Sequence, residues 1–207
     1  RDEIWRSARM DLDASGVERD GMRREGAGAT MTANCLPTFL GIGSMRCATS
    51  WLHRMLSLHP EIALPSPKQP NFFDKRILTR DLAWYRSQFR DGGERGRPLL
   101  RGEISTGYCK LGRRSVEMIR ATLGDGPIIF SIREPIERTW SQLRYELAHR
   151  TDRIDDATAL VLARANARRI DRYNDYLRTL RIWSSVFGRE RIHVALYDDL
   201  VTDRKST

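Results

Sequence analysis

Short apolar runs alternate along this chain with longer stretches whose apolar residues recur every three or four positions. The short runs, rich in branched and aromatic side chains, predict buried strands, and the longer stretches predict helices. The predicted strands are residues 37–43, 99–105, 127–132 and 191–197. The predicted helices are residues 48–58, 80–89, 113–123, 135–149, 155–165 and 169–187. Because strands and helices alternate, we expect an α/β fold, a three-layer parallel sheet flanked by helices.

Two segments depart from this alternation. Residues 61–75 contain three prolines, which favour irregular backbone or a short edge strand. Residues 1–35 lack apolar periodicity and hold four glycines, so we expect a flexible extension that is not part of the fold. The folded domain is then expected over residues 36–207. The sequence starts with an arginine, and Met31 is a candidate for the natural first residue.

The composition is that of an ordinary folded protein, with 40% hydrophobic and 30% charged residues over 207 positions. No stretch approaches the roughly 18 apolar residues that a membrane-spanning helix needs. The charged start of the sequence does not fit a secretory signal. Three scattered cysteines do not make a disulfide framework or a zinc site. We therefore expect a reducing, cytoplasmic compartment and no metal.

The formal net charge is +9, and residues 1–35 contribute −1, so the positive surplus lies in the expected domain. Arginine supplies 32 of the 36 basic side chains. Guanidinium groups bind phosphate in a planar fork, although a drift towards arginine codons gives the same composition. A basic surface suits an anionic ligand. A nucleic-acid-binding domain is the alternative, but no nucleic-acid motif supports it.

A loop of small residues joins the first predicted strand to the first predicted helix, with the sequence GSMRCATSWL over residues 43–52. Backbone N–H groups in such a loop point to one place at the positive end of a helix dipole. Thr49 and Ser50 add hydroxyl donors and Arg46 adds a full charge, which favours a site for a phosphate-like group. The alternative is a tight turn with a helix cap. The loop lacks the Gly-Lys-Ser/Thr sequence of nucleoside triphosphatases.

A second motif, IREPIERTWS, follows the clearest predicted strand over residues 132–141. Arg133 stands at the carboxyl end of that strand, and Ser141 lies two turns into the next helix. Ligands of parallel α/β sheets bind at the carboxyl ends of the strands, so both side chains are candidates for an anion site. The alternative is a surface ion pair of Arg133 or Arg138 with a neighbouring glutamate.

Together these motifs resemble those of the sulfotransferases that use 3′-phosphoadenosine 5′-phosphosulfate. In that family a loop of the form Gly-x-x-Lys-x-Gly/Ala-Thr-Ser/Thr-x-Leu is followed by an Arg and, eight residues later, a Ser. Four further segments resemble the family in the same order: residues 56–60 (LSLHP), 68–73 (KQPNFF), 102–108 (GEISTGY) and the acidic turn 197–200 (YDDL). The resemblance extends from Pro37 to Val201 and is greatest to the carbohydrate-type and bacterial branch.

The resemblance implies a P-loop nucleotide-hydrolase-like sulfotransferase fold and sulfuryl transfer to a hydroxyl or amine of a carbohydrate or small molecule. It implies that the donor's 5′-phosphosulfate binds to the loop residues Arg46, Cys47, Ala48, Thr49, Ser50 and Trp51. Arg133 and Ser141 would bind the 3′-phosphate. Lys68 would lie near the sulfuryl group and Gln69 would face the acceptor, so the catalytic candidates are Arg46, Lys68 and Gln69. Neither nucleic acid nor a membrane is expected as a partner.

Four positions depart from the family pattern. Arg46 replaces the loop lysine and keeps its charge in a bulkier group. Gln69 replaces the glutamate base of the carbohydrate branch and cannot take a proton from an acceptor hydroxyl. Ile104 replaces a lysine, and Thr106 replaces a proline. A catalytically impaired protein that still binds the nucleotide is therefore the alternative function.

Other groups are candidates for the missing base. Asp74 and Glu103 are the nearest acidic residues, and His53 projects from the helix after the loop. The family has a glutamate at the position of Glu103 beside a different catalytic glutamate, so we expect a structural role there. The family also continues after its last core strand with a basic, glycine-containing loop. We therefore expect residues 36–207 to be a C-terminally incomplete sulfotransferase domain.

Overall fold

The computed structural model describes residues 36–89, 100–149 and 172–203. These residues belong to one compact unit that begins at Leu36. The extension expected over residues 1–35 and the helix expected over residues 155–165 lie outside the described residues, so both stay predictions.

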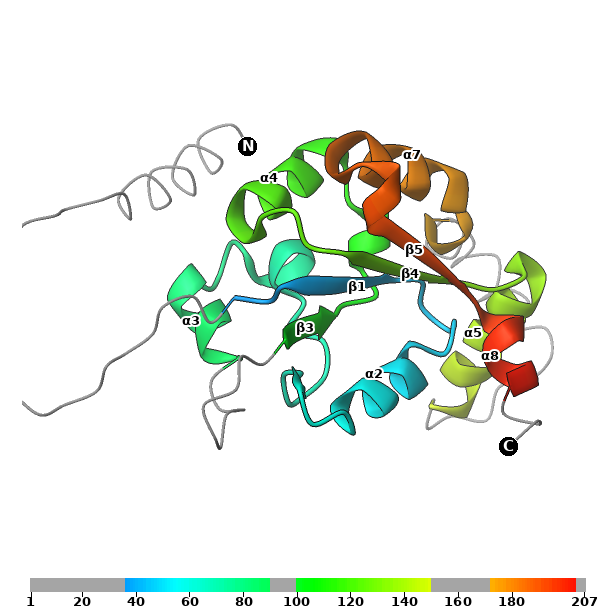
Figure 1. The fold of residues 1–207 in the computed structure, drawn as a ribbon. Coiled ribbons are helices and arrows are strands. Elements are labelled where there is room, and N and C mark those ends of the chain that lie inside the picture. Colours follow the sequence, from blue (N-terminus) through cyan, green and yellow to red (C-terminus); the bar gives the residue numbers. More distant parts are fainter. Residues whose placement is uncertain (1–35, 90–99, 150–171, 204–207) are drawn as a thin grey trace, which may run out of the picture. The chain divides into compact units, whose positions relative to one another are not determined.

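Five parallel strands form the sheet of the described unit, in the order β2–β3–β1–β4–β5 (Figure 1). The strands are β1 (Phe39–Gly43), β2 (Ile62–Ala63), β3 (Leu100–Ile104), β4 (Ile128–Ile132) and β5 (Ile192–Leu196). The expected parallel sheet flanked by helices is confirmed. The segment over residues 61–75 supplies the short edge strand β2 and, further on, one π-helical turn, Phe72–Arg76.

β1 lies at the centre of the sheet, and all of its residues are buried. Gly41 pairs with Ile104 of β3, and a Cβ atom at Gly41 would stand 2.8 Å from the Ile104 side chain. The packing of these two strands therefore depends on the absence of a side chain at Gly41. At the end of β1, Gly43 has a φ of 128°, which directs the chain into the following loop.

Helices cover both faces of the sheet. They are α2 (Thr49–Ser57), α3 (Leu82–Ser87), α4 (Arg113–Leu123), α5 (Pro135–Ala148), α7 (Tyr176–Phe187) and α8 (Tyr197–Asp203). Helices α4 and α7 pack side by side over one face, and α2 lies on the opposite face (Figure 1). Because α2 and α5 are the first helices after β1 and β4, both begin at the carboxyl edge of the sheet.

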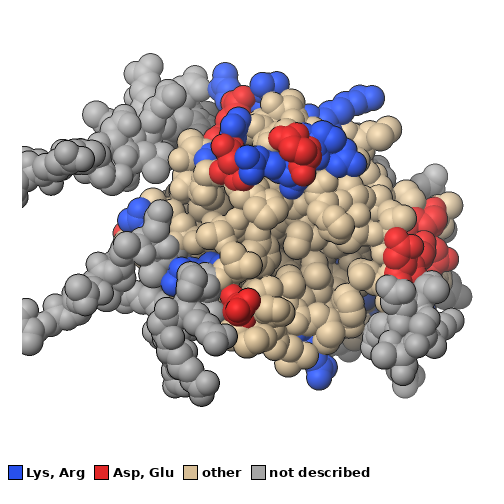
Figure 2. All heavy atoms as spheres, in the orientation of Figure 1, with Lys and Arg blue, Asp and Glu red and all other residues tan. Residues whose placement is uncertain are grey.

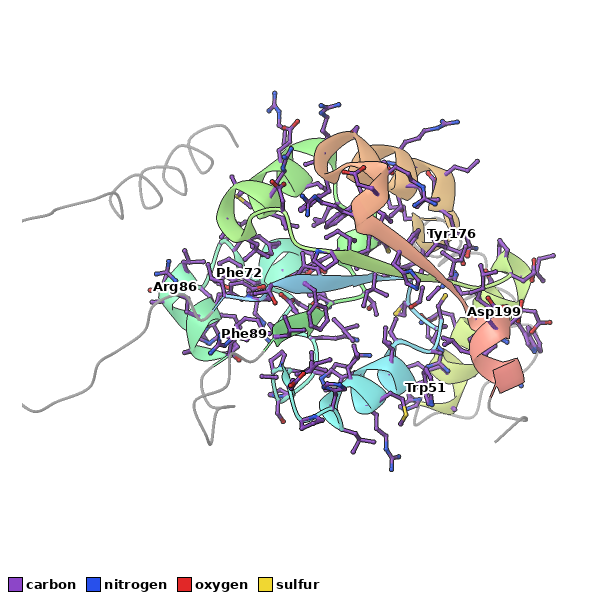
Figure 3. The ribbon with its side chains drawn as sticks, in the orientation of Figure 1. Trp51, Phe72, Arg86, Phe89, Tyr176 and Asp199 are labelled. Carbon is purple, nitrogen blue, oxygen red and sulfur yellow. The ribbon has the colours of Figure 1, made fainter. Side chains whose placement is uncertain are left out.

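Apolar side chains between the sheet and the α4–α7 layer form the main core. Val116, Ile119, Phe130 and Trp183 are completely buried there. Burial of a large apolar side chain contributes about 1.5–3 kcal/mol to stability. A second cluster packs aromatic rings at the α3 end of the sheet, where Figure 3 labels two of them; its members are Phe72, Phe73, Tyr85, Phe89 and Tyr108.

The structure differs from the predicted elements in two places. The helix expected over residues 169–187 is interrupted in its described part at Asp175, whose side chain accepts the N–H of Arg178 at the start of α7. Aspartate is a preferred helix N-cap, because its carboxylate satisfies an N–H group that has no partner within the helix. Residues 197–203, expected to start as a turn, instead form helix α8 directly after β5.

Candidate functional site

The two sequence motifs meet at the carboxyl edge of the sheet. β1 and β4 are neighbours at its centre, and the chain leaves them towards α2 and α5. The Nε atom of Arg46, in the loop after β1, donates to the hydroxyl of Ser141 on α5 at 3.1 Å. Residues that are 95 positions apart are thus in contact at the edge where ligands of parallel sheets bind.

Hydrogen bonds tie the loop over residues 44–48 to its surroundings. The N–H of Ser44 donates to the carbonyl of Ser131 at 2.6 Å, and its hydroxyl donates to the carbonyl of Tyr173 at 2.8 Å. Arg46 and Ala48 have φ values of 68° and 58°, a left-handed conformation that is rare for these residues. Among the described side chains, none caps α2, so the N–H groups of its first turn are available to an anion.

Arg138 supports this loop from inside the protein. The side chain is completely buried, which contradicts the surface ion pair considered for it from the sequence. Its Nη1 donates to the carbonyl of Met45 at 3.4 Å, and its Nε donates to Oδ1 of Asn174. Burial lowers the pKa of the guanidinium from its usual value. The buried cation adds positive potential next to the loop.

Lys68 approaches the start of α2 from the proline-rich segment. Its ammonium donates to the hydroxyl of Ser50 at 3.1 Å and to that of Thr49 at 3.3 Å. Burial lowers the pKa of Lys68 from 10.5 to about 8, because the ammonium loses hydration. The structure therefore places Lys68 with two of the loop residues that the sequence nominated for the 5′-phosphosulfate.

The side chain of Arg46 is directed towards α5. Besides its bond to Ser141, the guanidinium lies 4.6 Å from the ring centre of Tyr145. Stacking of this kind stabilises an arginine by about 0.5–1 kcal/mol at an accessible site. The sequence analysis did not identify Tyr145, although it stands four residues after Ser141 and so on the same face of the helix.

Arg133 lies at the carboxyl end of β4, as predicted, and is held by three groups. Its Nη2 lies 3.3 Å from Oε2 of Glu137, its guanidinium lies 4.1 Å from the ring centre of Tyr197, and its carbonyl accepts the hydroxyl of Tyr176. The ion pair that the sequence offered as the alternative to an anion site is thus present. It is made with Glu137, whose side chain is 60% exposed, whereas that of Arg133 is 14% exposed. A phosphate that binds Arg133 would therefore compete with Glu137 for the guanidinium.

Gln69 and Asn71 form a tight turn next to Lys68. Their φ values are 65° and 52°, and Nδ2 of Asn71 donates to the carbonyl of Gln69 at 2.8 Å. The side chain of Gln69 is half-buried. The turn fixes the backbone of the residue that is expected to face the acceptor.

The three candidate bases differ in accessibility. Glu103 is completely buried and accepts three hydroxyl groups, so the expected structural role fits its surroundings. Asp74 is half-buried, and burial raises its pKa. His53 lies 3.4 Å from the carbonyl of Pro65, and burial lowers its pKa.

The remaining loop residues have distinct surroundings. Cys47 is completely buried, and burial raises the pKa of its thiol to about 11, although the nearby charge of Arg138 opposes this shift. The thiol therefore fills space and does not react as a thiolate at neutral pH. Trp51 is half-buried on α2, where Figure 3 labels it.

Other features of the described residues lie outside this site. A groove of about 380 Å³ between α4 and α7 is lined by residues that include Arg113, Glu117, Arg120 and Asp125. Its charges are paired, Arg113 with Glu117 and Arg120 with Asp125. Within the described ranges, no group of three or more His, Cys, Asp or Glu side chains is arranged to hold a metal ion. No helix in the described part is long and apolar enough to cross a membrane.

Comparison with known proteins finds sulfotransferases both by sequence and by structure. No protein-family profile matches the chain. Over 113 residues, 55% of this chain, the sequence is 29% identical to a curated Dictyostelium discoideum protein named membrane-associated sulfotransferase kil1. The matched segment spans 24% of that protein, about a quarter of its length.

Two solved structures resemble the described unit. A sulfotransferase from Alicyclobacillus acidocaldarius has a TM-score of 0.68 and 24% identity, over 82% of this chain and 76% of that one. The sulfotransferase domain of the olefin synthase from Synechococcus PCC 7002 has a TM-score of 0.54 and 16% identity, over 88% and 74%. At these identities the two structures establish the fold alone. The Dictyostelium protein shows that the chain also resembles a sulfotransferase in sequence. The described unit therefore has the fold of these two sulfotransferases, and the chain is similar in sequence to one curated sulfotransferase over 55% of its length.

Proposed function

We propose that this chain transfers a sulfuryl group from 3′-phosphoadenosine 5′-phosphosulfate to a hydroxyl or amine of a carbohydrate or small-molecule acceptor. The observation that carries the proposal is the position of Lys68, whose ammonium binds both hydroxyls at the start of α2. The same edge of the sheet brings Arg46 onto Ser141. The sulfotransferase relatives support the class of reaction.

The donor groups at the start of α2 fit a phosphosulfate. The hydroxyls of Thr49 and Ser50, the first-turn N–H groups and the Lys68 ammonium all favour negative charge at one place. Lys68, from the separate proline-rich segment, supplies a compact cation next to this loop, whose own cation is Arg46.

Arg133 and Ser141 would select the 3′-phosphate, which distinguishes this donor from ATP. Arg133 presents a planar group with fixed charge, and the ring of Tyr197 restricts its position. Ser141 is buried next to Arg46 and offers a hydroxyl. A nucleotide with both a 5′-phosphate and a 3′-phosphate would therefore meet a cation at each end, Lys68 at the start of α2 and Arg133 at the end of β4.

The residues would act mainly by positioning and by stabilising charge. The donor supplies the activated sulfuryl group, and the loop and Lys68 hold its 5′ end in one orientation for in-line attack. Negative charge grows on the leaving oxygen as the bond to sulfur breaks. Arg46 and Lys68 are the cations that would stabilise that charge.

The glutamine at position 69 leaves the proposed mechanism without a general base to activate the acceptor. An amide orients a hydroxyl by hydrogen bonds but does not accept its proton, and Glu103 is too buried to replace it. A catalytically impaired protein that binds the nucleotide is therefore the second candidate function. The observation that favours it is the glutamine at position 69.

The nucleic-acid alternative has less support. Figure 2 shows Lys and Arg side chains mixed with Asp and Glu over the α4–α7 surface, where Arg113 pairs with Glu117 and Arg120 with Asp125. A nucleic-acid site typically has a continuous basic patch or stripe. The positive charge on this face is instead interrupted by carboxylates.

A transfer assay with labelled donor and a panel of saccharide, phenol and amine acceptors tests the proposal. We expect acceptor-dependent release of 3′,5′-adenosine bisphosphate, and its loss in Lys68→Met, which keeps an unbranched side chain of nearly the same length but removes the charge. Lys75→Met is the matched control, because Lys75 is exposed outside the site. Nucleotide binding without transfer to any acceptor would instead establish the impaired protein.

A further inference from the structure

A buried carboxylate at the end of β3 organises the aromatic cluster beside the site. Glu103 is completely buried and accepts hydrogen bonds from three hydroxyls. The donors are Tyr85, Ser105 at 2.5 Å and Tyr108 at 2.7 Å. Three donors on one carboxyl group satisfy most of its acceptor capacity, which is needed because water does not reach it.

Two of these hydroxyls also hold the backbone of the segment that follows Gln69. The hydroxyl of Ser105 accepts the N–H of Asn71 at 3.1 Å, and that of Tyr108 accepts the N–H of Phe73 at 3.2 Å. A hydroxyl has a single hydrogen, so its donation to Glu103 leaves only lone pairs towards the backbone. The carboxylate therefore orients both hydroxyls as acceptors for this segment.

The segment needs such support. Gln69 and Asn71 both have positive φ values, a conformation that persists only where the surroundings enforce it. Asn71 is bonded to the carbonyl of Gln69 through its side chain and to Ser105 through its backbone. Lys68 immediately precedes this turn, and its ammonium reaches Thr49 and Ser50. A continuous set of hydrogen bonds and backbone thus runs from Glu103 to the start of α2.

We infer that Glu103 is a positioning residue for the proposed sulfuryl transfer: through the hydroxyls of Ser105 and Tyr108 it fixes the turn that holds Lys68 and Gln69 against the anion loop. It does not exchange a proton with the acceptor. The consequence for transfer rests on the proposed function, whereas the consequence for the position of Lys68 does not.

The chain offers matched variants. Tyr108→Phe and Tyr85→Phe each remove one hydroxyl that Glu103 accepts, and both tyrosines are completely buried. Only the Tyr108 hydroxyl also accepts an N–H of the segment. Ser105→Ala removes the other bridge with a smaller change in volume. Tyr85→Phe therefore controls for a general loss of stability.

The position of Lys68 is measurable without any transfer reaction. Trace acetylation with acetic anhydride at a series of pH values, read by mass spectrometry of the Lys68 peptide, reports the pKa of this amine. Burial holds that pKa at about 8 in the parent chain. If the turn loosens, the ammonium gains hydration, so Ser105→Ala and Tyr108→Phe should raise the pKa by about one unit. Tyr85→Phe should leave it unchanged.

The transfer assay gives a second reading. Ser105→Ala and Tyr108→Phe should lower kcat about tenfold with a smaller change in the KM for the donor, because misplacement of Lys68 affects the reacting group most. An unchanged Lys68 pKa in both variants would overturn the inference, as would an equal shift in Tyr85→Phe. A shifted pKa in a chain that transfers no sulfuryl group would uphold the positioning role and reject the proposed function.

Discussion

The Nε of Arg46 donates to the hydroxyl of Ser141 at 3.1 Å, which joins the loop after β1 to the helix after β4. In the proposed site, the first residue serves the 5′ end of the donor and the second its 3′-phosphate. One hydrogen bond therefore connects the two halves of the nucleotide site.

Ser141→Ala should weaken the binding of 3′,5′-adenosine bisphosphate by about 1 kcal/mol, roughly fivefold, the usual net contribution of one hydrogen bond. Calorimetric titration measures the change. Ser57→Ala is the control, because among the described residues that hydroxyl donates to the local carbonyl of Arg54 at the end of α2 and to no group of the site. Equal affinities of Ser141→Ala and the parent chain would remove Ser141 from the site.

Arg46→Ala should lower kcat for transfer far more than it weakens donor binding. The leaving oxygen gains charge only as the bond breaks, so the lost interaction is greatest in the transition state. Arg46→Lys should preserve or raise kcat, since it restores the compact cation of the family loop. Abolished transfer in Arg46→Lys would mean that the loop requires the guanidinium on Ser141 and Tyr145.

The pH dependence should report Lys68. Burial lowers its pKa to about 8, so the free chain loses this cation as the pH rises through about 8. The value of kcat/KM for the donor, which reflects the free protein, should therefore fall above about pH 8. A bound anion favours the ammonium, so kcat should fall only at higher pH. Lys68→Arg should remove the fall in kcat/KM, and a fall that persists in this variant would assign the titration to another group.

Gln69→Glu should raise the rate of transfer to an alkyl hydroxyl such as that of a sugar. It restores a general base, a group that typically contributes about 10²–10⁴-fold, and the rate should climb as the pH passes the pKa of the new carboxylate. A phenol ionises more easily and should benefit little. If no acceptor gains while nucleotide binding is intact, the base lies elsewhere, and Asp74 and His53 are the next residues to replace.

Most elements of the fold were predictable because their signals are local. The run PIIFSI became β4, and the helix from Arg113 ends at Leu123 with Gly124 as its C-cap, as expected. The sequence did not predict the break in the helix at Asp175. The apolar residues keep a helical spacing on both sides of Asp175, so one capping residue does not stand out. The order of the strands in the sheet could not be predicted from the sequence either, because it depends on contacts between distant segments.

The site was predictable only in part for the same reason. The loop and the Arg133–Ser141 pair have recognisable spacing, and the structure brings both to one edge. Arg138 is buried, and Lys68 binds Thr49 and Ser50, through contacts between segments that are distant in the sequence. Such contacts leave no periodic signal in the sequence. The role of Ser105 as a bridge to Asn71 is of this kind too.

Selectivity for the 3′-phosphate is the most direct test of the account, and calorimetric titration of 3′,5′-adenosine bisphosphate and of 5′-adenosine monophosphate measures it. The parent chain should bind the bisphosphate more tightly. Arg133→Ala should weaken the bisphosphate by about 1.5–3 kcal/mol, the range for a hydrogen bond to a charged group, and scarcely affect the monophosphate. Arg113→Ala, which removes an arginine on α4, should change neither. Equal affinity of the parent chain for both nucleotides, or equal losses in Arg133→Ala, would contradict the account.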